Sequence, residues 1–195
     1  MPWGVRYHYV KNPGFTKHML QELYLVRHAA PDRTTGVPYH TPPGPPLTAI
    51  GVREAHAAGA WLVGRGTEQL FCSPFTRTRQ TAEAIAAALA LPITFAETLR
   101  EGAPGEKMDQ IRARTSELLT QIDDSPLRCV ALVSHGAPIR SLLEYTTDMH
   151  IDLRPHTYDN GNCAPTAGVW YGRRTSNGWA WELAFRPTQK ANSTS

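Results

Sequence analysis

The amino-acid sequence predicts an α/β protein, a three-layer α/β/α sandwich with a mostly parallel central sheet, helices on both faces and a C-terminal β-hairpin. Short apolar runs of the kind found in buried strands alternate with longer helical segments over most of the 195 residues, and this alternation is typical of layered α/β folds. Toward the end of the chain, two apolar runs flank Ser176, Asn177 and Gly178, which form a typical hairpin turn.

Local patterns place the individual elements. The residues from Leu23 to Val26 form a continuous apolar run that ends at Arg27, as expected of a strand buried on both faces. Ser73 and Pro74 predict a helix start, with serine as the N-cap and proline in the first turn. The expected strands are 22–27, 69–73, 92–96, 129–134, 169–173 and 179–185. The expected helices are 48–63, capped by Thr48, then 74–89, 106–123 and a last one that follows a tight turn at 135–138 and runs to about 145.

One domain is expected, because a chain of this length with 41% hydrophobic residues can bury a core of its own. We expect the domain to span 21–187. Residues 1–20 predict an accessory strand or arm, and 188–195 predict a flexible tail. No stretch in 1–20 is apolar enough for a signal sequence, and no segment is long enough to span a membrane.

Charge and cysteine content narrow the function classes. A net charge of +3 is too small to indicate nucleic-acid binding, but it suits an anionic small substrate. Cys72, Cys129 and Cys163 are far apart and form no metal-binding spacing or disulfide framework, so they predict reduced thiols in a cytoplasmic protein. Oligomeric state cannot be read from the sequence.

Residues 31–46 predict an irregular loop, because six prolines fall within them. The loop follows the first strand directly, so Tyr39 and His40 are candidates for the wall of a binding pocket. A ligand for a proline-reading partner domain is the alternative interpretation of the same segment.

Polar side chains follow three of the predicted strands at the point where each strand ends. Arg27 and His28 follow the first strand, Ser73 to Arg77 the second, and Ser134 with His135 the fourth. Open α/β sheets bind ligands beyond the carboxyl ends of their strands, so we expect these side chains to converge. Two arginines suit a phosphate, because each guanidinium makes paired bonds to oxygens. A histidine beside them suits phosphoryl transfer through a covalent intermediate.

Five ordered motifs resemble those of the histidine phosphatase superfamily, in its phosphoglycerate mutase-like branch. The resemblance runs from about Glu22 to Trp181. Any one motif is weak evidence, but five in order at plausible spacing are specific. The matching segments are Arg27-His28-Ala29, Leu47-Thr48-x-x-Gly51, Ser73-Pro74-Phe75-Thr76-Arg77-Thr78-Arg79-Gln80-Thr81-Ala82, Leu99-Arg100-Glu101 and Ser134-His135-Gly136.

The resemblance implies a role for each matching residue. His28 would be the nucleophile that becomes phosphorylated. Arg27, Arg77 and His135 would bind the non-bridging oxygens and offset charge in the transition state. Glu101 would be the general acid for the leaving alcohol and then the base that activates water. Because side chains supply the positive charge, the resemblance implies no metal and no cofactor.

Two of these assignments have alternatives. Glu97 and Glu106 flank the same loop as Glu101 and compete with it for the acid–base role. A metal site made from His28 and His135 is disfavoured by the two arginines expected beside them, because cations repel.

The loop after the nucleophile departs from the family pattern. Ala29 stands where the family usually has glycine, Pro31 where it has threonine or serine, and Thr34 where it has asparagine. Alanine keeps the backbone N–H that could contact a phosphate, whereas proline removes a donor. We expect substrate contacts from Thr34, Gly136, Tyr39 and His40, in a pocket that differs from those of better-known relatives.

The expected activity is that of a metal-independent phosphatase that hydrolyses a small-molecule phosphomonoester through a phosphohistidine on His28 and releases inorganic phosphate. Phosphoglycerate mutase-type phosphoryl transfer is the first alternative, and a non-catalytic phospholigand-binding protein on the same fold is the second. Sugar phosphates, cofactor precursors, nucleotides and phosphoproteins all remain open as substrates. Neither nucleic acid nor membrane is an expected partner.

Overall fold

The computed structural model describes residues 20–187. Within them the chain forms one mixed sheet of six strands in the order β3-β2-β4-β1-β5-β6. The strand or arm predicted for 1–20 lies, except for Leu20, outside the described residues, as does the tail predicted for 188–195. The strands are β1 (Glu22–Arg27), β2 (Gln69–Cys72), β3 (Ile93–Phe95), β4 (Cys129–Ser134), β5 (Val169–Thr175) and β6 (Gly178–Phe185).

The parallel part of the sheet brings the ends of β1 and β4 together. Strands β3, β2, β4 and β1 run parallel, whereas β5 and β6 form an antiparallel hairpin along β1. Arg27 is paired with Ser134, so β1 and β4 end level with each other. The residues that follow the two strands, His28 and His135, are therefore neighbours at one edge of the sheet.

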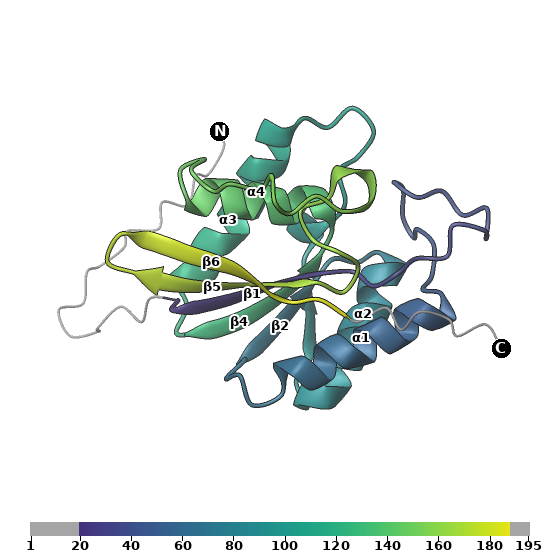
Figure 1. Ribbon diagram of the computed structural model, residues 1–195, viewed down its shortest axis with the longest axis horizontal. Helices are drawn as coiled ribbons and strands as arrows, with labels where there is room; N and C mark the ends of the chain where they lie inside the picture. Colours follow the sequence, from purple (N-terminus) through teal and green to yellow (C-terminus); the bar gives the residue numbers. More distant parts are fainter. Residues whose placement is uncertain (1–19, 188–195) are drawn as a thin grey trace, which may run out of the picture.

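Four longer helices cover the sheet in two pairs (Figure 1). The helices α1 (Ala49–Leu62) and α2 (Thr76–Leu89) lie on one face, and α3 (Met108–Asp123) and α4 (Gly136–Thr146) lie on the other. The predicted α/β fold, with helices on both faces, a mostly parallel sheet and a C-terminal hairpin, is confirmed. Among the described residues there is no helix with the length and apolar character that crossing a membrane requires.

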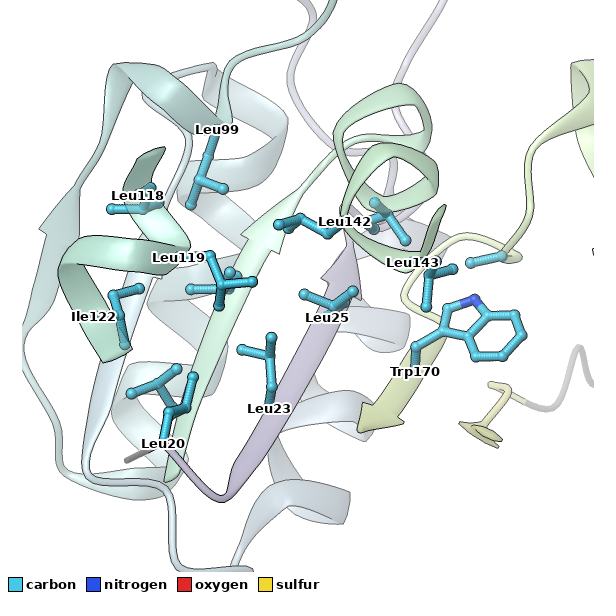
Figure 2. Packing of buried hydrophobic residues seen from close by; sticks show 14 of the residues in the cluster. Leu20, Leu23, Leu25, Leu99, Leu118, Leu119, Ile122, Leu142, Leu143 and Trp170 are labelled. Atoms are coloured by element: carbon cyan, nitrogen blue, oxygen red, sulfur yellow. The ribbon is translucent and has the colours of Figure 1, made fainter. Parts of the chain in front are cut away.

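Strand β1 contributes to a hydrophobic core on each face of the sheet. Leu25 lies in one cluster with Leu119 and Leu142, between the sheet and the α3–α4 pair (Figure 2). Val26 belongs to the cluster on the opposite face. Successive strand residues point to opposite faces, so a continuous apolar run is what a strand covered on both sides requires. Burying one such leucine contributes about 1.5–3 kcal/mol, which anchors the strand that ends in the polar residues.

The start of α2 differs from the prediction. Ser73 is not its N-cap and Pro74 is not its first residue, because the helix begins at Thr76. The Ser73 hydroxyl lies instead 2.8 Å from His135 Nε2, a residue 62 positions later. A local helix-start pattern cannot reveal such a distant competing partner, which is why the N-cap prediction was wrong.

The predicted start of α1 is confirmed, whereas the predicted start of α4 is corrected. Thr48 caps α1 as predicted, with its hydroxyl accepting the Gly51 N–H at 2.9 Å. The tight turn predicted at 135–138 is absent, because α4 begins directly at Gly136 and takes Pro138 into its first turn. Proline is tolerated there since first-turn N–H groups have no helical acceptor.

The irregular proline-rich loop and the unpaired cysteines are present as predicted. Residues 31–46 contain no helix or strand beyond a single bridge between Pro31 and Leu47. Cys72, Cys129 and Cys163 are unpaired and buried. Burial raises the pKa of Cys129 to about 12 and that of Cys163 to about 11, so both remain thiols.

Candidate active site

The ends of three parallel strands bring four charged or titratable side chains together. Arg27 and His28 follow β1, Arg77 lies in the first turn of α2 after β2, and His135 follows β4. All four are buried, with at most 1% of each residue exposed. The predicted convergence at the carboxyl edge of the sheet is therefore present, and it forms a buried polar cluster beside the hydrophobic core.

His28 is oriented by the backbone next to it. Its Nδ1 lies 2.8 Å from the Ala29 carbonyl oxygen, and because a carbonyl only accepts, the proton belongs on Nδ1. The lone pair is then on Nε2, which lies 3.3 Å from the Tyr39 hydroxyl. Burial, followed by the charges of Arg27 and Arg77, lowers the pKa of His28 well below its usual value, so the imidazole is neutral.

His135 is also neutral, with its proton on Nδ1, but its Nε2 is held by Ser73. We assign the Ser73 hydroxyl as the donor to His135 Nε2 at 2.8 Å, because the opposite tautomer would point the Nδ1 lone pair at the Glu101 carboxylate, 3.5 Å away. The proton of His135 then lies on Nδ1, a buried atom with no hydrogen-bond partner among the described residues. Burial, followed by the charge of Arg77, lowers the pKa of His135, which therefore offers a neutral N–H donor to a ligand.

Arg77 and Glu101 form an ion pair beside His135. Arg77 Nη2 lies 3.4 Å from Glu101 Oε2, and the same carboxylate oxygen lies 3.5 Å from His135 Nδ1. Arg77 Nη1 donates to the Tyr39 carbonyl at 3.1 Å, while its Nε is buried and has no partner among the described residues. Like the His135 Nδ1–H, this guanidinium edge is a donor that an anion can use.

The positions of the three candidate carboxylates favour Glu101 for acid–base chemistry. Glu97 is exposed at the surface. Glu106 binds Arg100 and Arg114. Burial raises the pKa of Glu106, but the Arg114, backbone and Arg100 hydrogen bonds outweigh it and lower the pKa to about 2, so Glu106 is a poor proton carrier.

Arg27 has a partner that sequence patterns did not indicate. Asp159 binds its guanidinium through both carboxylate oxygens, at 2.6 and 2.8 Å. The Ala164 carbonyl accepts a third bond from Nη1 at 2.8 Å. Burial lowers the pKa of Arg27, but the bonds and charge of Asp159 outweigh burial and raise it, so the arginine stays charged. No spacing pattern links residues 132 positions apart, which explains why the pair was missed.

The backbone after His28 is satisfied by side chains and not offered to a ligand. The Ala29 N–H donates to Thr81 Oγ1 at 3.0 Å, and the Ala30 N–H donates to Glu54 Oε2 at 2.9 Å. The sequence-based expectation that the Ala29 N–H could contact a phosphate is therefore not met in this structure. Thr81 falls in the matched motif after Ser73, whereas nothing in the sequence singles out Glu54.

The predicted substrate-binding residues of the 31–46 loop separate into two groups. Tyr39 joins the cluster, with Arg77 and Arg33 each placing a guanidinium over its ring, at 4.2 and 4.1 Å from the centroid. Arg33 was not predicted. His40 is exposed and contacts the Tyr39 ring, and Thr34 is exposed and donates to Asp32 at 2.6 Å, outside the buried cluster.

Gly136, the fourth predicted substrate-binding residue, is buried at the start of α4. A Cβ atom there would collide with the Asn162 side chain. Because glycine has no side chain, the 158–162 turn can pack directly against the start of α4. In this structure Gly136 therefore has a packing role.

The cluster also contains a donor set that a metal could use. His28, Glu101 and His135 offer ligand atoms within 4.8 Å of one another, and imidazole nitrogen with carboxylate oxygen suits zinc. However, Arg77 lies 3.4 Å from the same carboxylate. A buried cation beside the ligands repels a metal and attracts an anion, so the electrostatics favour a phosphate.

Comparison with known proteins agrees with this geometry. The model of the histidine phosphatase superfamily (branch 1) matches residues 23–105 and 101–180. Proteins of Yersinia pestis and Yersinia pseudotuberculosis named probable phosphoglycerate mutase GpmB are 36% identical over 138 residues, which cover 69% of this chain. The matched region spans only 62% of the length of those curated relatives.

Solved structures share the fold at low identity. A mycobacterial glucosyl-3-phosphoglycerate phosphatase in complex with VO3 superposes with a TM-score of 0.70 and 20% identity, covering 84% of this chain and 98% of the other. A putative alpha-ribazole-5'-P phosphatase from Escherichia coli gives a TM-score of 0.68 and 16% identity, covering 84% and 96%. The family model matches most of the chain, including His28, His135 and nearly all of the sheet. The chain therefore belongs to branch 1 of the histidine phosphatase superfamily.

Proposed function

We propose that this protein is a metal-independent phosphatase that hydrolyses a small phosphomonoester through a phosphohistidine on His28. The observation that carries the proposal is the state of that imidazole. It is buried and neutral, with its proton on Nδ1 and its lone pair on Nε2, beside Arg27 and Arg77. A neutral nucleophile between two cations suits attack on an anionic phosphorus centre.

In the first step, Nε2 of His28 attacks phosphorus, and the bond from phosphorus to the leaving oxygen breaks. Arg77, Arg27 and the Nδ1–H of His135 bind the non-bridging oxygens, where negative charge gathers in the transition state. Glu101 delivers a proton to the leaving oxygen. The phosphoryl group must displace the Tyr39 hydroxyl, which lies 3.3 Å from Nε2 in the free protein.

In the second step, water attacks the phosphorus atom of the phosphohistidine. Glu101, now a carboxylate, takes a proton from this water, and the electron pair of the P–N bond returns to Nε2. Inorganic phosphate leaves and His28 is restored. The same carboxyl group serves as acid and then as base, because the second step is chemically the reverse of the first with water in place of the alcohol.

Phosphoglycerate mutase activity is the second candidate, favoured by the names of the Yersinia relatives. It requires the phosphohistidine to return its phosphoryl group to a sugar acid before water reaches it. Formation of 2-phosphoglycerate from 3-phosphoglycerate plus bisphosphoglycerate would support it. Failure to form this product would exclude the mutase reaction and leave hydrolysis.

The first test is phosphate release from p-nitrophenyl phosphate in the presence of EDTA. Wild type should turn over, and His28→Ala should lose at least about a thousandfold in kcat/KM. His56→Ala is the matched control, because His56 is exposed on α1. Equal rates for wild type and His28→Ala would remove His28 from the mechanism. Tight vanadate binding with no turnover of any phosphomonoester in a broad panel would indicate a phospholigand-binding protein instead.

A further inference from the structure

Arg27 is held by a carboxylate from a distant loop, and we propose that this residue, Asp159, is a positioning residue that aims the Arg27 guanidinium at the phosphoryl group. The inference rests on the proposed function, because it assigns a role within the same site. Asp159 would act only through Arg27 and would not touch the reacting atoms.

The donors of Arg27 can be counted one by one. A guanidinium has five N–H groups, two on each Nη and one on Nε. Nη1 uses both of its donors, one to Asp159 Oδ1 at 2.6 Å and one to the Ala164 carbonyl at 2.8 Å. Nη2 uses one, to Asp159 Oδ2 at 2.8 Å. The second Nη2–H and the Nε–H remain, and Nε is buried with no partner among the described residues.

These two remaining donors lie on one edge of the planar group and form a fork that matches two phosphate oxygens. Besides Asp159, the groups that act electrostatically on Arg27 include Tyr39 and Glu101, which belong to the candidate site. Arg27 in turn lowers the pKa of His28. Asp159 therefore occupies the outer edge of the guanidinium and leaves the inner edge to a ligand.

The segment that carries Asp159 is itself anchored. The Asp159 carbonyl oxygen accepts the Asn162 Nδ2–H at 2.7 Å, and the Gly161 carbonyl oxygen accepts from Arg140 of α4 at 3.1 Å. Asn162 packs where Gly136 has no side chain. The carboxylate is thus presented from a turn fixed against α4, although half of the Asp159 side chain (48%) is open to solvent.

A different role for the same contact would be a latch, in which Asp159 imitates a phosphate and must leave before the ligand binds. The two roles predict opposite effects of removing the carboxylate charge. A latch releases the arginine, so anion affinity rises. A positioning residue lets the guanidinium turn, so anion affinity falls. The donor count favours positioning, because the ligand edge of Arg27 is free while Asp159 is bound.

The experiment measures vanadate affinity and p-nitrophenyl phosphate turnover in the full chain with Asp159→Asn. Misplacing a catalytic group by about 1 Å costs on the order of a hundredfold, so we expect tenfold to about a hundredfold weaker vanadate binding and a similar loss in kcat/KM. Asp152→Asn is the matched control, since Asp152 lies in the same loop but pairs with exposed Arg154. It should change both values less than twofold.

The effect should disappear when Arg27 is absent. In an Arg27→Gln background, Asp159→Asn should change vanadate affinity less than twofold, because no guanidinium remains to be aimed. Tighter vanadate binding in Asp159→Asn would overturn positioning in favour of a latch. An equal loss in both backgrounds would show a purely structural role.

Asp159→Glu gives an independent reading if the asparagine variant does not fold. It keeps the charge but shifts the carboxylate, so we expect vanadate binding to weaken at least threefold, and unchanged affinity would overturn the inference. Failure of the proposed function is distinguishable, because wild type itself would then turn over no phosphomonoester, whether or not it binds vanadate.

Discussion

The carboxyl edge of the sheet and the 31–46 loop both contribute to the candidate site, but the protein builds them in different ways. Arg77 and His135 are completely buried and follow strands of a core covered on both faces. In the loop, Thr34 and His40 are exposed, whereas Tyr39 reaches the buried cluster. Under the proposed function, the buried strand ends would carry the phosphoryl chemistry, and the loop without regular structure would contribute to substrate selection.

The largest expected difference in activity is between variants of Arg77 and Arg33, which both stack over the Tyr39 ring. Arg77 and Arg33 both lie about 4 Å from the Tyr39 centroid, but Arg77 is buried and Arg33 is exposed. Arg77→Gln should lower kcat/KM for p-nitrophenyl phosphate about 10²–10³-fold, as expected for loss of a transition-state donor in a water-poor site. Arg33→Gln should cost only a few-fold. Similar losses in the two variants would contradict the proposed division of roles.

The next difference concerns the carboxylates of the segment after β3. Glu101→Gln should lower hydrolysis of an alkyl phosphate about 10²–10⁴-fold, because an alkoxide needs a proton to leave. With p-nitrophenyl phosphate, whose leaving group needs little protonation, the loss in the first step should be much smaller. Glu97→Gln, at an exposed position on the same segment, is the matched control and should behave as wild type. A loss in Glu101→Gln that does not depend on the leaving group would argue against a general acid.

A smaller difference should appear in stability against pH. Burial, followed by nearby positive charge, lowers the pKa of His28 and of His135 in the folded state. The unfolded chain binds protons at an ordinary histidine pKa of about 6.5. The unfolded state therefore binds more protons as pH falls below this value, and each histidine lowers the free energy of unfolding by up to about 1.4 kcal/mol per pH unit. Above about pH 6.5 their contribution is constant.

Urea unfolding at pH 7, 6 and 5 measures this dependence. His135→Gln should flatten the slope by one proton, whereas His40→Gln, in the exposed loop, should leave it unchanged. If both variants keep the wild-type slope, the buried histidine is not held neutral by the fold.

Sequence reasoning predicted the strand-end part of the site because the relevant signals are local. A buried strand followed by a polar residue is visible in a few positions, and parallel strands end at one edge, so Arg27, His28 and His135 could be placed together. Glu101 depended on the family motif, and the structure places it, and not Glu97 or Glu106, within 3.5 Å of His135 and Arg77.

The partners of these residues could not be predicted, because they come from distant parts of the chain. Asp159 is 132 positions from Arg27, and Ser73 is 62 positions from His135. Ser73 also shows how a local signal misleads, since a serine before a proline fits an N-cap but is used here by a histidine. Thr34 is a different case, because it was predicted from motif position alone, while its actual partner, Asp32, is only two residues away and forms a local Asx-type turn.

The most direct test of the account is to trap the covalent intermediate. Wild type mixed with a phosphomonoester, quenched in alkali during turnover and digested for mass spectrometry should carry one phosphoryl group on His28, since the P–N bond requires a free Nε2 lone pair there. His28→Ala should carry none. A phosphoryl group on His135 or any other residue would contradict the proposed mechanism. Turnover by His28→Ala at the wild-type rate would contradict it as well.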